Sequence, residues 1–242
     1  MEAGEYTAMY RVEDRHWWYL GMRRTTQVLL DRYLGRQIPS ILDAGCGTGA
    51  NLVLLGQYGT AAGIDIEPAA LAMCQQRHLA RLAQGTVTAL PFASAMFDLV
   101  TSFEVLYHLA VSDDTAALRE FWRVLKPGGW LLLRVPAHDW LRGRHDAAVH
   151  TRHRYSMGEV GRKVQGAGFR IVRLNYANCL LFPLAVAKRM AERVLPPGEG
   201  SDVGAPPPGN SALAAILSAE AAWLRRCPLP WGLSVLCLAR KA

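Results

Sequence analysis

The sequence predicts an α/β domain in which helices cover both faces of a doubly wound, largely parallel β-sheet. A chain of 242 residues fits one large domain of this class. Short apolar runs alternate with longer segments of helical length, which is the pattern of successive β-α-β units. The runs are continuously apolar, as expected for strands that are buried on both faces.

Each predicted strand is a short apolar run, and several end in residues typical of turns. The first run leads from Ile38 into Asp43-Ala44-Gly45. The second is closed by Glu67-Pro68, where proline suits the first turn of a helix. We therefore expect strands at about 38–42, 61–66, 82–87, 97–102, 130–135 and 169–176.

Capping residues and helix breakers delimit the predicted helices. Asp113-Asp114 is typical of a helix N-terminus rather than of a metal-binding pair, and Lys126-Pro127-Gly128-Gly129 ends that helix. Ser156 and Glu159 match a capping box at the start of another helix. We expect helices at about 22–34, 51–58, 68–78, 115–125 and 156–166.

The two ends of the chain depart from this rhythm and divide the single domain into parts. Residues 1–36 form a helical lid that carries the aromatic run from His16 to Tyr19, unless this helix simply docks on the sheet. Residues 37–176 form the core, residues 177–230 a helical cap insertion, and residues 231–242 the final strand. Within the insertion we expect helices at about 184–195 and 211–226, joined by a loop rich in Pro and Gly.

The insertion leaves two questions open. Lys188 and Arg189 lie beside an apolar helix face, which suits either an interfacial helix next to anionic lipid or ordinary core packing. Glu220 interrupts an apolar stripe of the second helix, where it either pairs with an arginine or touches a substrate.

Composition excludes several classes of protein. With 51% hydrophobic residues and a net charge of +7, the chain is not disordered. The five cysteines include no C-x-x-C pair, so neither a disulfide framework nor a zinc site is indicated, and we expect no metal. No run reaches the length of a transmembrane helix. The acidic N-terminal residues do not resemble a signal peptide, so we expect a cytoplasmic protein.

Much of the positive charge is spread along the chain, so binding of nucleic acid is not expected. One local concentration lies between Trp140 and Lys163, a stretch that contains six basic and two acidic residues. A peripheral membrane contact stays open, and the sequence does not define an oligomeric state.

The glycine turn after the first strand indicates a site for a nucleoside-containing cofactor. Glycines in Asp43-Ala44-Gly45-Cys46-Gly47-Thr48-Gly49 allow positive φ and close approach of a ligand. Asp65 ends the next strand, where an acid can bind both ribose hydroxyls. Gly45-x-Gly47-x-x-Ala50 also fits the dinucleotide fingerprint, whereas Asp43 better suits a cofactor with a cationic amino-acid tail.

Five motifs, in order and spacing, resemble those of class I S-adenosylmethionine-dependent methyltransferases, specifically the type 11 group. They are Ile41–Gly49, Gly63-Ile64-Asp65-Ile66, Ala89-Leu90-Pro91-Phe92, Phe97-Asp98-Leu99-Val100 and Arg123–Gly129. The resemblance implies a Rossmann-like sheet of seven strands. The antiparallel last strand, from Trp231 to Ala239, would lie beside the fifth. It also implies S-adenosyl-L-methionine as the cofactor.

The resemblance implies a set of cofactor-binding residues: Asp43, Gly45, Cys46, Gly47, Gly49, Asp65, Ile66, Val87, Thr88, Phe103 and Glu104. Thr86 stands where related enzymes often carry an acid for the adenine amine. Backbone groups of Val87 and Thr88 would take over that contact. Arg23 or Arg24 would pair with the methionine carboxylate.

The expected reaction is in-line methyl transfer to a small-molecule or amphipathic, lipid-linked acceptor of anionic character. His108 is the candidate base, with a purely structural histidine as its alternative. The candidate substrate-binding residues are Trp18, Tyr107, His150, Arg152, His153, Arg154 and Tyr155. No motif identifies the acceptor atom. The alternatives are an NAD-dependent oxidoreductase and a catalytically inactive protein that binds S-adenosylmethionine.

Overall fold

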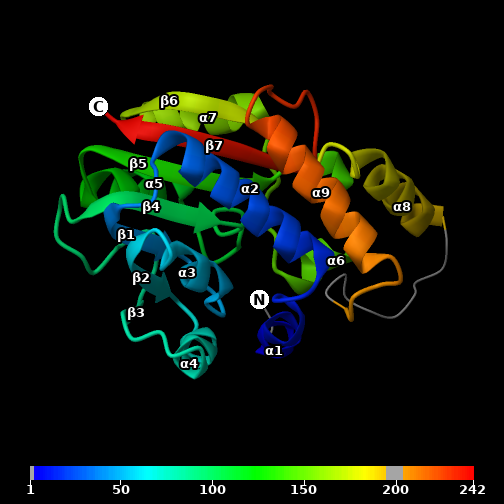
Figure 1. Ribbon diagram of the computed structural model, residues 1–242, viewed down its shortest axis with the longest axis horizontal. Coiled ribbons are helices and arrows are strands. Elements are labelled where there is room, and N and C mark those ends of the chain that lie inside the picture. Colours follow the sequence, from blue (N-terminus) through cyan, green and yellow to red (C-terminus); the bar gives the residue numbers. More distant parts are fainter. Residues whose placement is uncertain (1–2, 195–203) are drawn as a thin grey trace.

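The computed structural model describes residues 3–194 and 204–242, and most of the expected Pro/Gly loop lies outside these ranges. Seven strands in the described part form one sheet in the order β3-β2-β1-β4-β5-β7-β6 (Figure 1). They are β1 (Ile38–Ala44), β2 (Gly59–Asp65), β3 (Leu82–Gln84), β4 (Phe97–Phe103), β5 (Leu125–Pro136), β6 (Phe169–Ala177) and β7 (Ser234–Lys241).

The strand directions confirm the expected fold class. The pairs among β1 to β5 are parallel, whereas β7 runs antiparallel to both β5 and β6. The last strand therefore lies beside the fifth, as the resemblance implied. This arrangement is an open, Rossmann-like sheet, whose ligands bind at the carboxyl ends of the strands.

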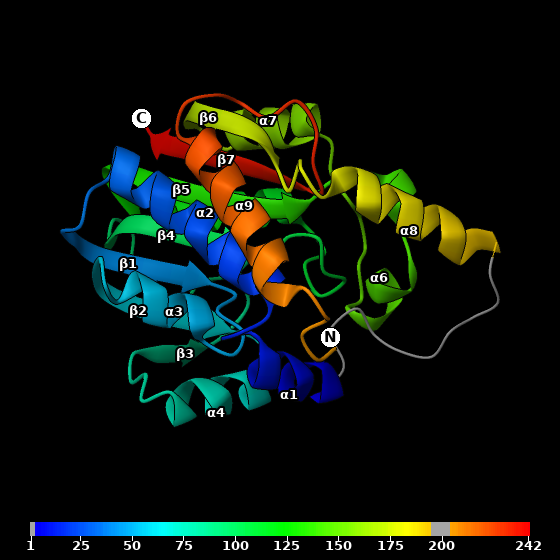
Figure 2. The same cartoon turned by 45° about the vertical axis from the view of Figure 1, so that its right-hand side comes forward.

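Helices cover both faces of the sheet and its carboxyl edge. They are α1 (Ala3–Val12), α2 (Trp17–Tyr33), α3 (Ala50–Leu55), α4 (Pro68–Gln76), α5 (Asp114–Val124), α6 (Arg144–Ala148), α7 (Met157–Gly166), α8 (Phe182–Val194) and α9 (Asn210–Leu224), with a short 3₁₀ turn η1 (Asp139–Leu141). Figure 2 shows α1, α6 and α8 beyond the carboxyl ends of the central strands.

The alternation of side chains along each strand decides which helices they meet. Ile41, Leu99 and Leu132 are buried with residues of α2, α3 and α9 on one face. Their neighbours Leu42, Val100 and the two flanking leucines of β5 are buried with α5 and α7 on the other. Both faces are fully covered, which explains why these strands are continuously apolar in sequence.

Helix caps account for most of the helix starts. The Asp113 side chain accepts hydrogen bonds from the backbone N–H groups of Thr115 and Ala116, which confirms its role as an N-cap. Ser156 caps α7 by accepting from Glu159. This contact is one half of the predicted capping box. The Glu159 carboxylate, which would supply the other half, instead lies 2.8 Å from Nε2 of His153.

The N-terminal region is more helical than predicted. α2 begins five residues before the expected start, because Nδ1 of His16 accepts the backbone N–H of Trp18. α1 and α6 were not predicted. The side chains that pack α2 on the sheet, including Leu29 and Leu30, are fully buried.

The cap insertion packs on α2 through α9. A Cβ on Gly21 would lie 2.4 Å from Cδ1 of Leu217, so only glycine allows this approach of the two helices. Among the described residues, Glu220 pairs with no arginine, and it does not line the cavity at the carboxyl edge of the sheet. Its carboxylate accepts the backbone N–H groups of Asn178 (2.6 Å) and Leu180 (2.8 Å).

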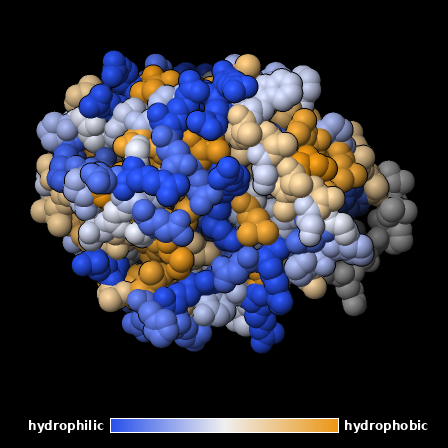
Figure 3. Space-filling model, viewed as in Figure 1, coloured by the Kyte–Doolittle hydropathy of each residue, from blue (hydrophilic) through white to orange (hydrophobic). Residues whose placement is uncertain are grey.

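Hydrophobic side chains gather on the surface over α8 and the neighbouring part of α9, as Figure 3 shows. Within the described residues, no helix combines the length and the hydropathy that crossing a bilayer requires.

Candidate active site

A cavity of about 900 Å³ lies at the carboxyl edge of the sheet. Its wall combines the glycine turn after β1, the ends of β2, β4 and β5, the N-terminal helices α1 and α2, and parts of α6 and α8. Binding sites for small molecules and cofactors span roughly 300–1,000 Å³, so this space lies near the upper end of that range.

The glycine turn has the backbone geometry that the sequence indicated. Gly45, Gly47 and Gly49 all have positive φ, at 86°, 53° and 90°. A Cβ on Gly45 would lie 2.3 Å from Cγ2 of Val105. Substitution there therefore meets both a strained backbone and a steric clash.

Asp65 ties the end of β2 to this turn. Its two carboxylate oxygens accept the backbone N–H groups of Gly47 (2.8 Å) and Glu67 (3.0 Å). Burial raises the pKa of this carboxyl, and backbone hydrogen bonds from Glu67, Gly47 and Ile66 oppose that shift. A carboxylate has about four acceptor positions, so Asp65 keeps some acceptor capacity for ligand hydroxyls.

Ile66 follows Asp65 and is half exposed although it lines the cavity. Thr86 and Val87 line the same space. Together they offer an apolar slot of a kind that suits a planar ring.

Asp43 is a buried carboxylate with an incomplete set of partners. Thr101 donates its hydroxyl to Oδ1 at 2.7 Å, whereas Oδ2 has no hydrogen-bond partner among the described residues. Desolvation raises the pKa of Asp43 to about 7. A buried oxygen without a donor is costly, and a cationic ligand group would supply the missing partner.

Arg134 is a cavity residue that sequence reasoning missed. It is buried, donates to Glu104 at 2.9 Å, and places its guanidinium 4.8 Å from the ring centre of Phe103 and 5.7 Å from that of Trp18. In the sequence Arg134 is a single charged residue within the apolar run of β5, and the apolar residues around it indicate only a buried strand.

The segment after α1 is joined to the glycine turn by buried charged groups. Thr48 donates its hydroxyl to the Glu13 carboxylate, which also accepts from Arg77 at 2.8 Å. Arg77 donates in addition to the Thr48 carbonyl at 3.0 Å. Tyr6, Met9 and Glu13 line the cavity, so α1 and the segment after it form part of its wall.

His108 also lines the cavity and is half buried. Its Nδ1 accepts the backbone N–H of Ala110 at 3.1 Å, which makes Nε2 the protonated nitrogen of the neutral ring. Desolvation, with help from His150, lowers the pKa of His108 to about 4. The ring is therefore neutral near pH 7 and better suited to donate a hydrogen bond than to act as a strong base.

The structure brings together most of the expected cofactor-binding residues. Those that line the cavity are Gly45, Cys46, Gly47, Asp65, Ile66, Val87, Phe103 and Glu104. Gly49 and Thr88 lie directly next to lining residues in the chain and Asp43 two residues before Gly45, but none of the three is part of the wall. Arg23 lines the cavity, whereas Arg24 does not.

The expected substrate-binding residues are divided. Trp18, Tyr107 and Arg154 line the cavity, whereas His150, Arg152, His153 and Tyr155 do not. Arg152 reaches Asp114 at 3.3 Å, and the Tyr155 hydroxyl lies 2.8 Å from the same carboxylate. His153 pairs with Glu159. These side chains stabilise the loop instead of forming the cavity wall.

The basic segment is largely neutralised by acidic side chains from the same loop and from α5. Arg154 forms two hydrogen bonds with the buried Asp146, and Arg142 binds Asp139. Lys163 binds Asp114 at 2.8 Å. The net charge of this segment therefore does not translate into an open anion-binding loop.

In the described ranges, no group of three His, Cys, Asp or Glu side chains is placed to hold a metal ion.

Comparison with known proteins places residues 42–133 in a family model described as a methyltransferase domain. A Mycolicibacterium smegmatis protein named "Probable S-adenosylmethionine-dependent methyltransferase" is 28% identical over 163 residues, which are 65% of this chain and 61% of that protein. The malonyl-[acyl-carrier protein] O-methyltransferase of Erwinia billingiae is 39% identical over 115 residues, or 44% of this chain and 42% of that enzyme. The alignments thus span about half the length of these relatives.

The fold extends further than the sequence similarity. A protein solved in complex with the Haloferax volcanii Trm112 methyltransferase activator, and described there as a "putative methyltransferase", superimposes with a TM-score of 0.63. The superposition covers 98% of this chain and 94% of that one at 20% sequence identity.

Proposed function

Because the chain carries a class I S-adenosylmethionine-dependent methyltransferase domain, we propose that it transfers a methyl group to a small or amphipathic acceptor. The observation that carries this proposal is the pair of acids at adjacent strand ends. Asp43 and Asp65 flank a glycine turn beside the cavity of about 900 Å³.

The residues present fit the cofactor. Asp65 retains acceptor positions for the ribose hydroxyls, and Ile66 and Val87 form an apolar slot for the adenine. The unpartnered Oδ2 of Asp43 suits the cationic amino-acid end, since a buried carboxylate is stabilised by an opposite charge. When bound, S-adenosylmethionine supplies an electrophilic methyl group on a sulfonium.

The protein's own contribution is alignment and exclusion of water. Trp18, Tyr107 and His108 form the wall beside the turn, and α1 covers it. Fixing two reactants in line can supply roughly 7–11 kcal/mol in favourable intramolecular models. In this account His108 orients the acceptor through its Nε2–H.

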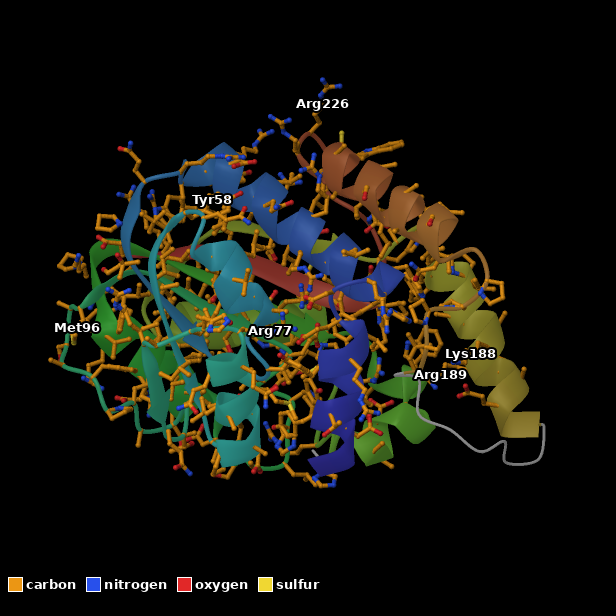
Figure 4. All side chains as sticks on the ribbon, turned by 60° about the horizontal axis from the view of Figure 1, so that its bottom comes forward. Tyr58, Arg77, Met96, Lys188, Arg189 and Arg226 are labelled. Atoms are coloured by element: carbon orange, nitrogen blue, oxygen red, sulfur yellow. The ribbon has the colours of Figure 1, made fainter. Side chains whose placement is uncertain are left out.

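The acceptor is an amphipathic molecule with an anionic group. The part of the cavity near α8 is lined by Leu141, Leu181 and Leu184, and by the cations Lys188 and Arg189 (Figure 4). Arg189 is held by Glu192 at 2.7 Å. The name of the Erwinia relative, a methyltransferase of a malonyl group on a carrier protein, is consistent with an anionic acyl acceptor.

The test is a transfer assay with a labelled methyl donor and separate polar and lipid extracts as acceptors. We expect label in an acidic compound of the lipid or acyl fraction, and loss of transfer with His108→Ala. Label only in neutral or basic polar compounds would contradict the acceptor class. Absence of transfer to every fraction, with cofactor binding intact, would favour an inactive binding protein.

A further inference from the structure

In α8 and α9, the two helices of the cap insertion, apolar side chains are exposed where a surface helix usually exposes polar ones. From Ala212 to Trp223, the exposed residues of α9 are Ala212, Ala215, Ile216, Ala219, Ala222 and Trp223, all apolar. The one acidic residue of α9, Glu220, is buried. A surface helix normally shows the opposite pattern, with its polar side in water.

α8 shows the same inversion. Among its residues 182–192, the exposed ones are Pro183, Leu184, Ala187, Lys188, Met190 and Ala191, whereas Arg189 and Glu192 are mostly covered and pair with each other. Leu184 is 64% exposed. Apart from Lys188, no polar side chain of the described residues 182–192 is exposed on this face.

The large apolar side chains exposed on these helices and on the loops next to them are here called the cap surface: Trp140, Leu180, Leu184, Ile216, Trp223 and Trp231. Contacts beneath it hold its parts together. Glu220 of α9 binds the backbone of Leu180, and the backbone of Trp231 hydrogen-bonds the Cys179 thiol. Trp140 packs edge-on against Phe182 at the start of α8. Figure 3 shows the hydrophobic patch over α8 and α9.

Among the exposed described residues of 178–192 and 204–233, every charged side chain is positive, whereas Asp139 beside Trp140 is exposed and paired with Arg142. Lys188 lies on α8, and Arg225 and Arg226 are exposed at the end of α9, where Figure 4 shows Arg226 directed away from the protein. In the described residues of 178–192 and 204–233, neither carboxylate, Glu192 nor Glu220, is exposed. Exposed tryptophans and cations around an apolar patch suit the headgroup region of an anionic membrane.

We propose that the cap surface docks the protein on the surface of an anionic lipid bilayer. Leu184 and Lys188 belong both to α8 and to the wall of the cavity, so docking brings the cavity next to the lipid. The docking itself follows from the exposed side chains. Only its consequence, that an amphipathic acceptor enters the cavity from the membrane, depends on the proposed function.

The experiment is flotation of the full chain with two kinds of vesicle, phosphatidylcholine alone and phosphatidylcholine with phosphatidylglycerol. We expect the protein to float with the anionic vesicles and much less with the neutral ones. Ile216→Glu and Trp223→Glu should each lower the partition about tenfold or more, since each loses an exposed apolar side chain that docking would bury in the bilayer. Arg225→Ser and Arg226→Ser should each lower it roughly fivefold.

Met96→Glu is the matched control, because the exposed fraction of Met96 (44%) lies between those of Ile216 (37%) and Trp223 (62%), while Met96 lies at the opposite end of the molecule from α8 (Figure 4). It should float like the wild type. Binding of S-adenosylhomocysteine should be equal in all these variants, which separates a failure of docking from a failure of the proposed function.

Any of three outcomes would overturn the proposal. The wild type does not float with anionic vesicles, or Ile216→Glu and Trp223→Glu float as well as the wild type. The third is a dimer in solution that Ile216→Glu dissociates while vesicles bind no protein, because the cap surface would then be a self-association interface.

Discussion

Glu13 and Arg77 form a buried ion pair, with an N–O distance of 2.8 Å, that fastens the N-terminal segment to the glycine turn. Both side chains are largely shielded from water, and burial raises the pKa of Glu13 despite the arginine. The pair joins the part of the chain that covers the cavity to the part that would hold the cofactor.

Arg77→Met should lower the free energy of unfolding by about 3 kcal/mol, since it leaves a buried carboxylate without its cation. It should also weaken binding of S-adenosylhomocysteine, because Thr48 loses the donor on its carbonyl. Denaturant titration and calorimetry measure the two effects. Arg81→Met, at an exposed arginine, is the control, and equal behaviour of both variants would contradict the role of the pair.

Asp43 should make stability depend on pH. Its pKa in the folded protein, about 7, lies above its ordinary value of 3.8, so the folded state binds the proton more tightly. The associated stabilisation is complete below about pH 4 and is lost as the pH rises toward about 7. The shift corresponds to about 4 kcal/mol. Asp43→Asn should remove this dependence in denaturant titrations across that range.

The same titration should govern cofactor binding. A cationic group next to Asp43 favours the ionised carboxylate, so affinity for S-adenosylhomocysteine should rise with pH up to about 7 in the wild type. In Asp43→Asn it should be lower and nearly flat. A wild-type affinity that does not change over this range would show that Asp43 does not face the cation.

His108→Ala should reduce turnover far more than cofactor affinity. Because the pKa of His108 is lowered to about 4, the wild-type kcat should show no limb from this residue near neutral pH. His108→Gln retains an N–H donor and should restore part of the activity. A limb near pH 6.5 that disappears in His108→Ala would instead identify the histidine as a base.

Gly21→Ala should destabilise the protein by about 1–3 kcal/mol, because the added methyl group clashes with Leu217 on α9. Gly4→Ala is the control, since a Cβ there meets no atom within 4 Å. Adding Leu217→Gly should reduce the difference between the two alanine variants, because it also removes the Leu217 Cβ, which lies 2.6 Å from the added methyl group. If Gly21→Ala is as stable as Gly4→Ala, α9 does not pack on α2 as described.

The core of the fold was predictable because its determinants are local. A run such as Ile41-Leu42 supplies one residue to each face of the sheet, and Asp113 caps the helix that follows it in sequence. The glycine turn has positive φ at the glycines that indicated it. In each case a few neighbouring residues carry the whole structural signal.

The surroundings of the site were less predictable because they depend on distant partners. Arg152 and Tyr155 meet Asp114, about forty residues away, so their charge and hydroxyl are used in stabilising the loop. α1 is anchored through the contact of Glu13 with Arg77. The exposed apolar face of α9 resembles a core stripe in sequence, and only the packing of Glu220 and Leu217 shows which side is covered.

The most direct test of the central claim is calorimetric titration with S-adenosylhomocysteine and, separately, with NAD. We expect wild-type protein to bind S-adenosylhomocysteine with one site and to show no binding of NAD, and Asp65→Asn to bind at least roughly tenfold more weakly through loss of a charged hydrogen bond. Asp31→Asn, at a partly exposed acid away from the cavity wall, should bind like the wild type. Binding of NAD in preference to S-adenosylhomocysteine, or equal affinity in Asp65→Asn, would contradict the account.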